Sequence, residues 1–148
     1  MASIERIVIK SVSRPQREDI DNISTWFCEV FDLGNKKDEL EPMLLKEIII
    51  NSINGSGVTS KELNKKLELP RSTVIYHLNR FIYSGLIIRK GRKYYLRSDD
   101  LASTMEDIQS EMFREFNRLI DLAQRMDDIL EVDYNGRRKE RERRHSRQ

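Results

Sequence analysis

Cationic side chains concentrate in the middle of this sequence, where their number and spacing suit the binding of a polyanion. Residues 59–97 hold ten Lys or Arg and only two acids, whereas residues 98–136 hold eleven acids and three bases. The overall charge of +2 conceals this segregation. A dense group of Lys and Arg creates a positive potential that attracts phosphates. The sequence therefore predicts that residues 59–97 bind nucleic acid.

Two stretches within this segment carry the chemistry. A predicted helix over residues 71–84 has one polar face, and Arg71 in its first turn would fork onto guanine O6 and N7. Asn79 and Arg80 lie further along, where phosphates are the expected targets. The second stretch is a predicted hairpin tip, whose bases would contact phosphates or the minor groove. The candidate DNA-contacting residues are Arg71, Ser72, Thr73, Tyr76, Asn79, Arg80, Arg89, Lys90, Arg92 and Lys93.

Each stretch also has a plainer interpretation. A polar helix face is often only solvated, and lysines on an edge strand protect it from pairing with other chains. The local excess of positive charge favours DNA contact in both stretches.

Local signals predict the elements that would position these residues. Thr59 and Glu62 form a capping box, because each side chain can bond to the other residue's backbone amide. Pro70 suits the start of the next helix because it lacks an N–H, and Gly85 suits its end. Two short helices about three residues apart make a helix-turn-helix. A type II′ turn at Gly91 then joins two short strands into a wing.

This segment resembles a known family. GVTSKELNKKLELPRSTVIYHLNRFIYSGLIIRKGRKYYLR is similar to ArsR-type and related archaeal or bacterial winged-helix regulators. The likeness covers about 40 of the 148 residues and is carried by Ser72-Thr73-Val74, Tyr76-His77-Leu78 and Ser84-Gly85-Leu86-Ile87. The resemblance implies a homodimer on palindromic DNA, often tuned by an effector. Metal-sensing members carry a cysteine pair in the first helix of the motif. Residues 61–66 contain no cysteine, so metal sensing is not carried over.

The rest of the sequence predicts an α+β, mostly helical fold. Residues 4–12 are rich in β-branched residues and predict an N-terminal strand. Apolar residues three and four apart predict a helix over residues 19–33, closed by Gly34, and another from Met43 to about residue 54. We expect a winged helix-turn-helix domain at residues 1–97 with its motif at 58–97, a long dimerisation helix at 98–133 and a disordered basic tail at 134–148.

A long amphipathic helix is predicted at about residues 99–132, roughly 50 Å in length. Its apolar residues form one continuous stripe that a small domain cannot bury alone. The expected partner is the same helix of a second chain, joined by residues 19–33, and the alternative is a fold-back onto residues 4–33. The candidate dimerisation residues are Met105, Ile108, Met112, Phe116, Leu119, Leu122, Met126 and Ile129.

The sequence gives little support for a metal site or for catalysis. The chain has one Cys and two His, so a zinc site within one chain would need carboxylates and distant contributors. No nucleophile neighbours a base, and no glycine-rich phosphate loop is present. We expect Cys28 and His77 to be packed side chains. The sequence predicts no enzyme activity, no metal and no cofactor, and leaves open an effector pocket between the first helix and the long helix.

These features predict a sequence-specific, double-stranded DNA-binding transcription regulator that acts as a homodimer, with repression favoured over activation. The alternative is a winged-helix module for protein interaction or assembly, including RNA-associated complexes, because fold alone does not fix function. No apolar stretch has membrane length and no secretory signal is seen, so we expect a cytoplasmic protein without a membrane partner. The tail, RRKERERRHSRQ, would strengthen DNA binding or contact another acidic partner, and the alternatives are a solvated end or partial screening of the acidic long helix.

Overall fold

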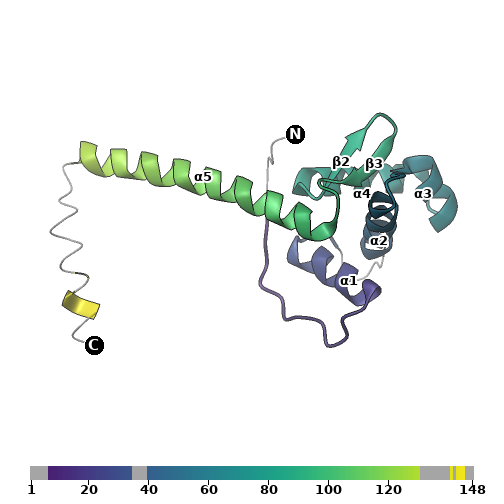
Figure 1. The fold of residues 1–148 in the computed structure, drawn as a ribbon, viewed down its shortest axis with the longest axis horizontal. Coiled ribbons are helices and arrows are strands. Elements are labelled where there is room, and N and C mark those ends of the chain that lie inside the picture. Colours follow the sequence, from purple (N-terminus) through teal and green to yellow (C-terminus); the bar gives the residue numbers. More distant parts are fainter. Residues whose placement is uncertain (1–6, 35–39, 131–140, 142, 146–148) are drawn as a thin grey trace. The chain divides into compact units, whose positions relative to one another are not determined.

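The computed structural model describes residues 7–34, 40–130, 141 and 143–145, and the chain divides into two units, residues 1–109 and residues 110–148. The fold is α+β and mostly helical, as predicted. Five helices and three short strands are described, and Figure 1 labels them in chain order. They are α1 (Ile20–Val30), α2 (Leu40–Ile53), β1 (Val58–Thr59), α3 (Ser60–Leu67), α4 (Arg71–Ser84), β2 (Ile87–Lys90), β3 (Lys93–Leu96) and α5 (Leu101–Ile129).

The three strands form one antiparallel sheet in the order β1-β3-β2. The hairpin pairs Ile87 with Leu96 and Lys90 with Lys93, and β1 pairs Val58 with Tyr94. The hairpin matches its prediction. The two-residue strand β1 was not predicted, because so short an element has no periodicity of its own.

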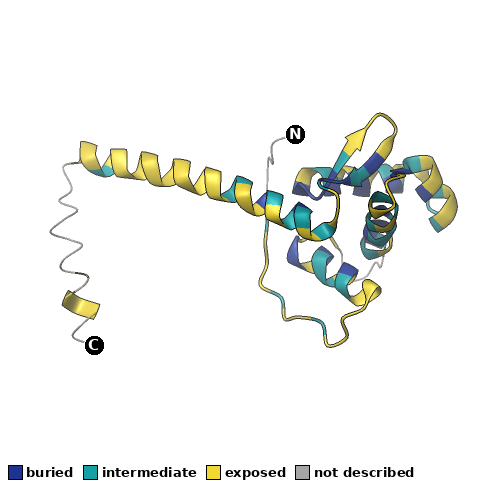
Figure 2. Ribbon diagram, in the orientation of Figure 1, coloured by how far each residue is buried: buried dark blue, intermediate teal, exposed yellow. Residues whose placement is uncertain are grey.

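The core of the first unit lies where α2, α4 and the sheet meet. Each large aliphatic or aromatic side chain that is fully buried there stabilises the fold by about 1.5–3 kcal/mol. Figure 2 shows these buried positions in dark blue. The fully buried side chains include Leu44, Leu45, Ile48, Leu63, Val74, Leu78, Phe81, Leu86, Ile87 and Leu96.

The predicted N-terminal strand is wrong for the residues that the structure describes. Residues 7–12 form no strand, and residues 4–6 lie outside the described part of the chain. Instead, the Lys10 amide donates to the Val30 carbonyl, and the Trp26 indole donates to the Val12 carbonyl. These bonds attach the segment to α1. Without a neighbouring strand edge, β-branched residues alone do not make a strand.

Helix α1 ends earlier than predicted, at Val30, and Gly34 does not close it. Asp32 takes the left-handed conformation, with φ of 54°. The Asp32 amide donates to the Glu29 carbonyl, and the Leu33 amide donates to the Cys28 carbonyl. This is a Schellman cap with Asp in the place that glycine usually takes.

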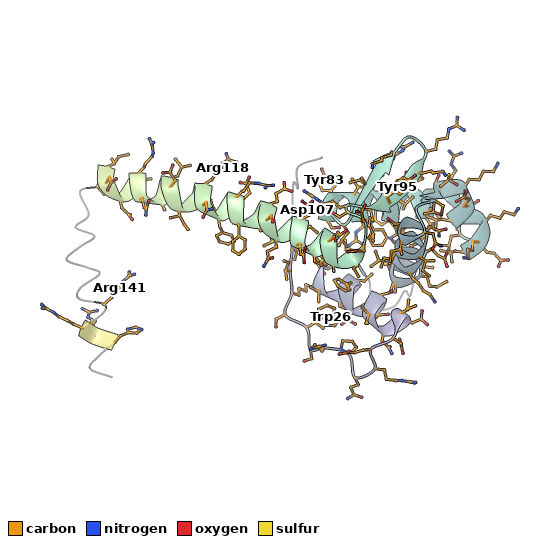
Figure 3. The ribbon with its side chains drawn as sticks, in the orientation of Figure 1. Trp26, Tyr83, Tyr95, Asp107, Arg118 and Arg141 are labelled. Atoms are coloured by element: carbon orange, nitrogen blue, oxygen red, sulfur yellow. The ribbon has the colours of Figure 1, made fainter. Side chains whose placement is uncertain are left out.

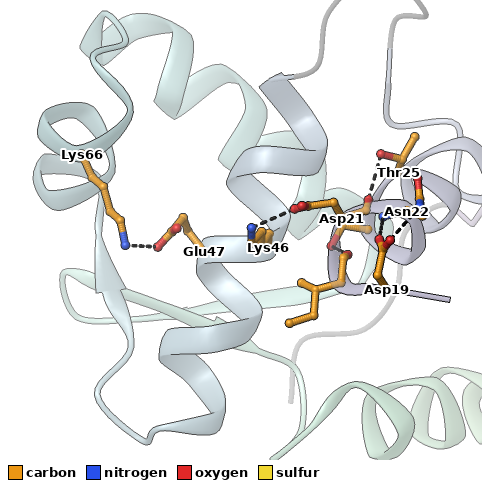
Figure 4. Close-up of polar contacts among 9 residues, drawn as sticks. Asp19, Asp21, Asn22, Thr25, Lys46, Glu47 and Lys66 are labelled. Carbon is orange, nitrogen blue, oxygen red and sulfur yellow. Dashed lines mark hydrogen bonds and ion pairs between the residues drawn. The ribbon is translucent and has the colours of Figure 1, made fainter. Parts of the chain in front are cut away.

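Ion pairs on the surface connect the first three helices (Figure 4). Lys46 on α2 lies 2.8 Å from Asp21 on α1, and Lys66 on α3 lies 2.8 Å from Glu47 on α2. Such solvent-exposed pairs add little to stability. They fix the relative positions of helices that the apolar core already holds together.

The first turns of α5 belong to the first unit and are tied to the end of the sheet. The Asp100 carboxylate accepts from the Ser103 amide, which lowers the pKa of Asp100 and caps the helix. Arg97 is buried and pairs with Asp107, and the Thr104 hydroxyl accepts from the Ser98 amide. Residues 101–108 are thereby held against their own unit.

The tail predicted as disordered lies mostly outside the described residues. Residues 141 and 143–145 are described, and they are helical, contrary to that prediction. No helix among the described residues combines the length and apolar character needed to cross a membrane.

Candidate nucleic-acid interface

The connection between α3 and α4 is fixed by local hydrogen bonds. The Thr59 hydroxyl accepts from the Glu62 amide at 3.1 Å, and the Glu62 carboxylate accepts from the Thr59 amide at 3.2 Å. The predicted capping box is therefore confirmed. At the other end of α3, Glu68 is left-handed with φ of 52°, and the Asn64 side chain donates to the Leu69 carbonyl. The three residues between the helices thus form a defined turn.

Helix α4 separates into a buried face and an exposed face, as the sequence predicted. Val74, Leu78 and Phe81 have no exposed surface. Arg71 and Ser72 in the first turn are exposed, and Thr73 is half-buried. On the outer face Tyr76 is 60% exposed, and Asn79 and Tyr83 are exposed as well. The structure therefore presents the N-terminal candidates on one accessible helix surface.

Arg80 is less accessible than the sequence suggested, because it contacts three neighbours within the chain. Its Nη2 donates to the Asp32 carbonyl at 3.1 Å, and its Nη1 lies 3.9 Å from a carboxylate oxygen of Glu41. Its guanidinium carbon lies 5.9 Å from the centre of the Tyr76 ring. We assign Arg80 to holding α4 against α1 and α2. Contact with DNA by Arg80 would be secondary.

His77 is packed between α4 and α2, as expected for a structural histidine. Its Nδ1 lies 3.3 Å from a carboxylate oxygen of Glu41, and both residues are buried. Nδ1 of His77 and Oε2 of Glu41 have no hydrogen-bond partner among the described residues. The pair makes a close polar contact in the core, away from the exposed face of α4.

Cys28 is buried on α1, and its thiol is unreactive. Burial raises the pKa of its thiol to about 12, and the carboxylates of Glu41 and Glu29 act in the same direction. The thiol therefore stays protonated at neutral pH, when it is a poor nucleophile and a poor metal ligand. No group of three or more His, Cys, Asp or Glu in the described part of the chain could hold a metal ion.

The hairpin presents four exposed cationic side chains around a tight turn. Gly91 has φ of 62°, and the only described non-glycine residues with positive φ are Asp32 and Glu68. Arg92 therefore has negative φ, which is the combination of a type II′ turn, as predicted. The cations at the tip are Arg89, Lys90, Arg92 and Lys93, all exposed.

Contacts within the hairpin, and with the loop that precedes β1, hold three of these cations in place. Arg89 donates to the Gly91 carbonyl at 2.8 Å and lies 5.7 Å from the centre of the Tyr94 ring. Lys90 lies 5.7 Å from the centre of the Tyr95 ring, and Lys93 donates to the Ser56 carbonyl at 2.9 Å. Figure 3 shows Tyr95 among the hairpin side chains. Because the cations are pre-positioned yet exposed, less side-chain entropy is lost when a phosphate binds.

Gly57 supports the hairpin in a way that the sequence analysis missed. It has φ of 64°, and a Cβ at this position would lie 2.6 Å from the ring of Tyr95. Only glycine therefore lets β1 lie beside β3 with Tyr95 in place. Tyr94 lies in the core and Tyr95 is half-buried.

The apolar stripe of α5 changes environment along its length. Ile108 is 3% exposed and Met105 is half-buried, so these two candidates serve the first unit and not a dimer seam. From residue 113 onward the large apolar side chains are exposed, and Figure 2 shows this stretch mostly in yellow. The exposed residues are Phe113, Phe116, Leu119, Ile120, Leu122, Met126, Ile129 and Leu130, and the candidate Met112 is half-buried. Phe113 and Ile120 were not predicted, because they lie beside the narrower stripe of candidate dimerisation residues.

The sequence left open an effector pocket between the first helix and the long helix, whereas one cavity of the first unit lies between the end of α1 and helix α4. This cavity of about 270 Å³ is lined by Val8, Phe31 and Leu33 on one side and by Arg80 and Tyr83 of α4 on the other. It is open to solvent and slightly smaller than the roughly 300–1,000 Å³ of typical ligand sites.

Comparison with known proteins gives no match, whether with protein-family models, curated proteins or solved structures. The resemblance to winged-helix regulators therefore stays a prediction.

Proposed function

We propose that this chain is a winged helix-turn-helix protein that binds double-stranded DNA sequence-specifically as a homodimer and regulates transcription in the cytoplasm, with repression as the expected direction. One arrangement carries the proposal. Two short helices joined by a three-residue turn are followed directly by a hairpin whose tip carries four exposed cations. This is the order of elements in a winged DNA-binding motif.

In this proposal α4 reads bases and the hairpin binds the backbone. The first turn of a recognition helix enters the major groove, where Arg71 would donate two bonds to guanine and Tyr76 would contact a neighbouring base edge. Asn79 would bond to a phosphate. The hairpin cations would neutralise phosphates beside the site, which contributes to affinity but not to sequence choice.

The homodimer is supported by the exposed apolar face of α5. Burial of a Leu, Ile, Phe or Met side chain stabilises an interface by about 1.5–3 kcal/mol. Eight such side chains are exposed between residues 113 and 130. A two-fold pair of chains would place two recognition helices about one DNA turn apart, roughly 34 Å.

A protein-interaction module is the second candidate, and one observation favours it. Tyr76 and Tyr83 lie seven residues apart on α4 and are 60% and 59% exposed. Tyrosine is enriched at protein interfaces, so this face would also suit a protein partner. Such a partner would need an acidic surface to complement the charge of the hairpin cations.

The two candidates differ in what Arg71 and Tyr76 do. We expect Arg71→Ala or Tyr76→Ala to cost about 1–3 kcal/mol on the preferred DNA site and to relax base preference at one position. The measurement is titration of each variant with the preferred site and with random duplex. Lys61→Ala is the control, because it alters a cation outside α4. Equal losses on both duplexes would reassign the residue to backbone contact, and no loss on either would favour the protein-interaction module.

A further inference from the structure

The apolar face of α5 is wider than a single partner helix covers. Successive residues of an α-helix are rotated by about 100°, so the exposed apolar side chains can be placed around the axis. They run from Ile129 and Leu122 on one flank, through Leu119 and Phe116, to Ile120 and Phe113 on the other. This arc spans about 200°, or more than half of the helix circumference, and it also contains Glu115 and Asp127.

A two-stranded coiled coil would leave both flanks of this arc in solvent. Its seam uses only positions spaced alternately three and four residues apart, and here Phe116, Leu119, Ala123 and Met126 have that spacing. The flank residues would stay exposed, although they are large and apolar, and Ile129 is 76% exposed in the single chain. Soluble proteins rarely leave such contiguous apolar surface uncovered. Each α5 therefore needs two helical neighbours.

Little else in the described part of the chain could supply the second neighbour. Among large hydrophobic side chains, α1 exposes only Ile20, so it offers a small apolar surface. Helix α2 exposes three such side chains, at 37–58%, against eight between residues 113 and 130. Glu115 lies within the arc, between Leu122 and Met126 around the axis, and its carboxylate is 3.1 Å from Arg118 on the polar side. The surface that best fits an apolar arc is another copy of that arc.

We propose that the protein is a tetramer in which residues 112–130 of four chains form a four-helix bundle. The inference rests on the proposed DNA-binding homodimer and extends it. An even number of chains is required because half-sites are paired by two-fold symmetry, and a tetramer built from two dimers is the next common assembly. Each bundle would carry two pairs of DNA-binding units. One assembly would therefore hold two separate operators at once.

The test is the mass of the full-length protein in solution, measured by light scattering after size exclusion at micromolar concentration. We expect about 70 kDa, which corresponds to four chains of 17.6 kDa. Phe113→Lys combined with Ile120→Lys charges one flank and should give about 35 kDa. The matched control is Asn117→Lys with Gln124→Lys, which adds the same charge at the same spacing on the polar side and should keep the tetramer. Circular dichroism confirms that each variant retains its helix.

The mass tests the tetramer and the DNA titration tests the DNA-binding proposal, so either proposal can fail without the other. A wild-type dimer overturns the tetramer and leaves the homodimer standing. A flank variant that keeps the tetramer mass overturns the bundle in which that flank is packed. The flank variant should still bind one inverted repeat within about three-fold of wild type, whereas it should no longer bring two labelled duplexes together. A tetramer that shows no preference for any duplex would count against the DNA-binding proposal alone.

Discussion

Replacement of both Leu119 and Leu122 by Lys will dissociate the protein into monomers and weaken its binding to a two-half-site operator by about 10²–10⁴-fold. Both side chains are exposed in the single chain, so the substitutions do not disturb the core of the first unit. In an assembly they would place lysines in a desolvated apolar seam, where an unpaired charge costs several kcal/mol. The second half-site would then no longer be held near the first.

Sedimentation velocity and operator titration together measure this effect. Asn117→Lys with Gln124→Lys is again the control, because it adds equal charge outside the apolar arc. Binding to a single half-site should change little in the double leucine variant. An assembled variant, or monomers that bind the operator as tightly as wild type, would show that α5 does not join the chains.

Removal of the four hairpin cations will weaken binding to every duplex and flatten its dependence on salt. Log affinity falls with log salt by about 0.9 per phosphate neutralised, so Arg89, Lys90, Arg92 and Lys93 changed to Ala together should reduce the slope by up to about 3.6. Specific and random duplexes should lose affinity by similar factors, because phosphate contacts carry no sequence information.

The fold should survive this quadruple substitution, since all four side chains are exposed. The bonds of Arg89 to the Gly91 carbonyl and of Lys93 to the Ser56 carbonyl lie at the surface, and their loss should cost at most about 1 kcal/mol each. Thermal unfolding of the variant checks this point. A salt slope identical to that of wild type would remove the hairpin from the interface.

The parts of the fold that the sequence predicted best are those fixed by neighbouring residues. The capping box at Thr59 and Glu62 and the turn at Gly91 each depend on chemistry within a few residues. The two faces of α4 follow from helical periodicity. The element order that supports the candidate interface was therefore predictable.

The features that the sequence did not predict are those determined by contacts between residues far apart in the chain. Residues 7–12 have strand-forming side chains but attach to α1, and no local signal reveals which edge a segment will meet. Arg80 is a cationic residue on the polar face of α4, which suggested contact with DNA. Its position in the fold brings it to the Asp32 carbonyl and to Glu41. Ile108 belongs to the stripe of α5, and only the packing of residues 101–108 on the first unit shows that it is used there.

The central claim is sequence-specific DNA binding, and selection of bound sequences from a random duplex pool tests it most directly. The full-length protein is incubated with the pool at moderate salt, and bound duplexes are amplified and sequenced over several rounds. We predict enrichment of an inverted repeat whose half-sites are one helical turn apart, about 34 Å, and loss of that enrichment in the Arg71→Ala variant. Recovery of duplexes without any common sequence would contradict the claim.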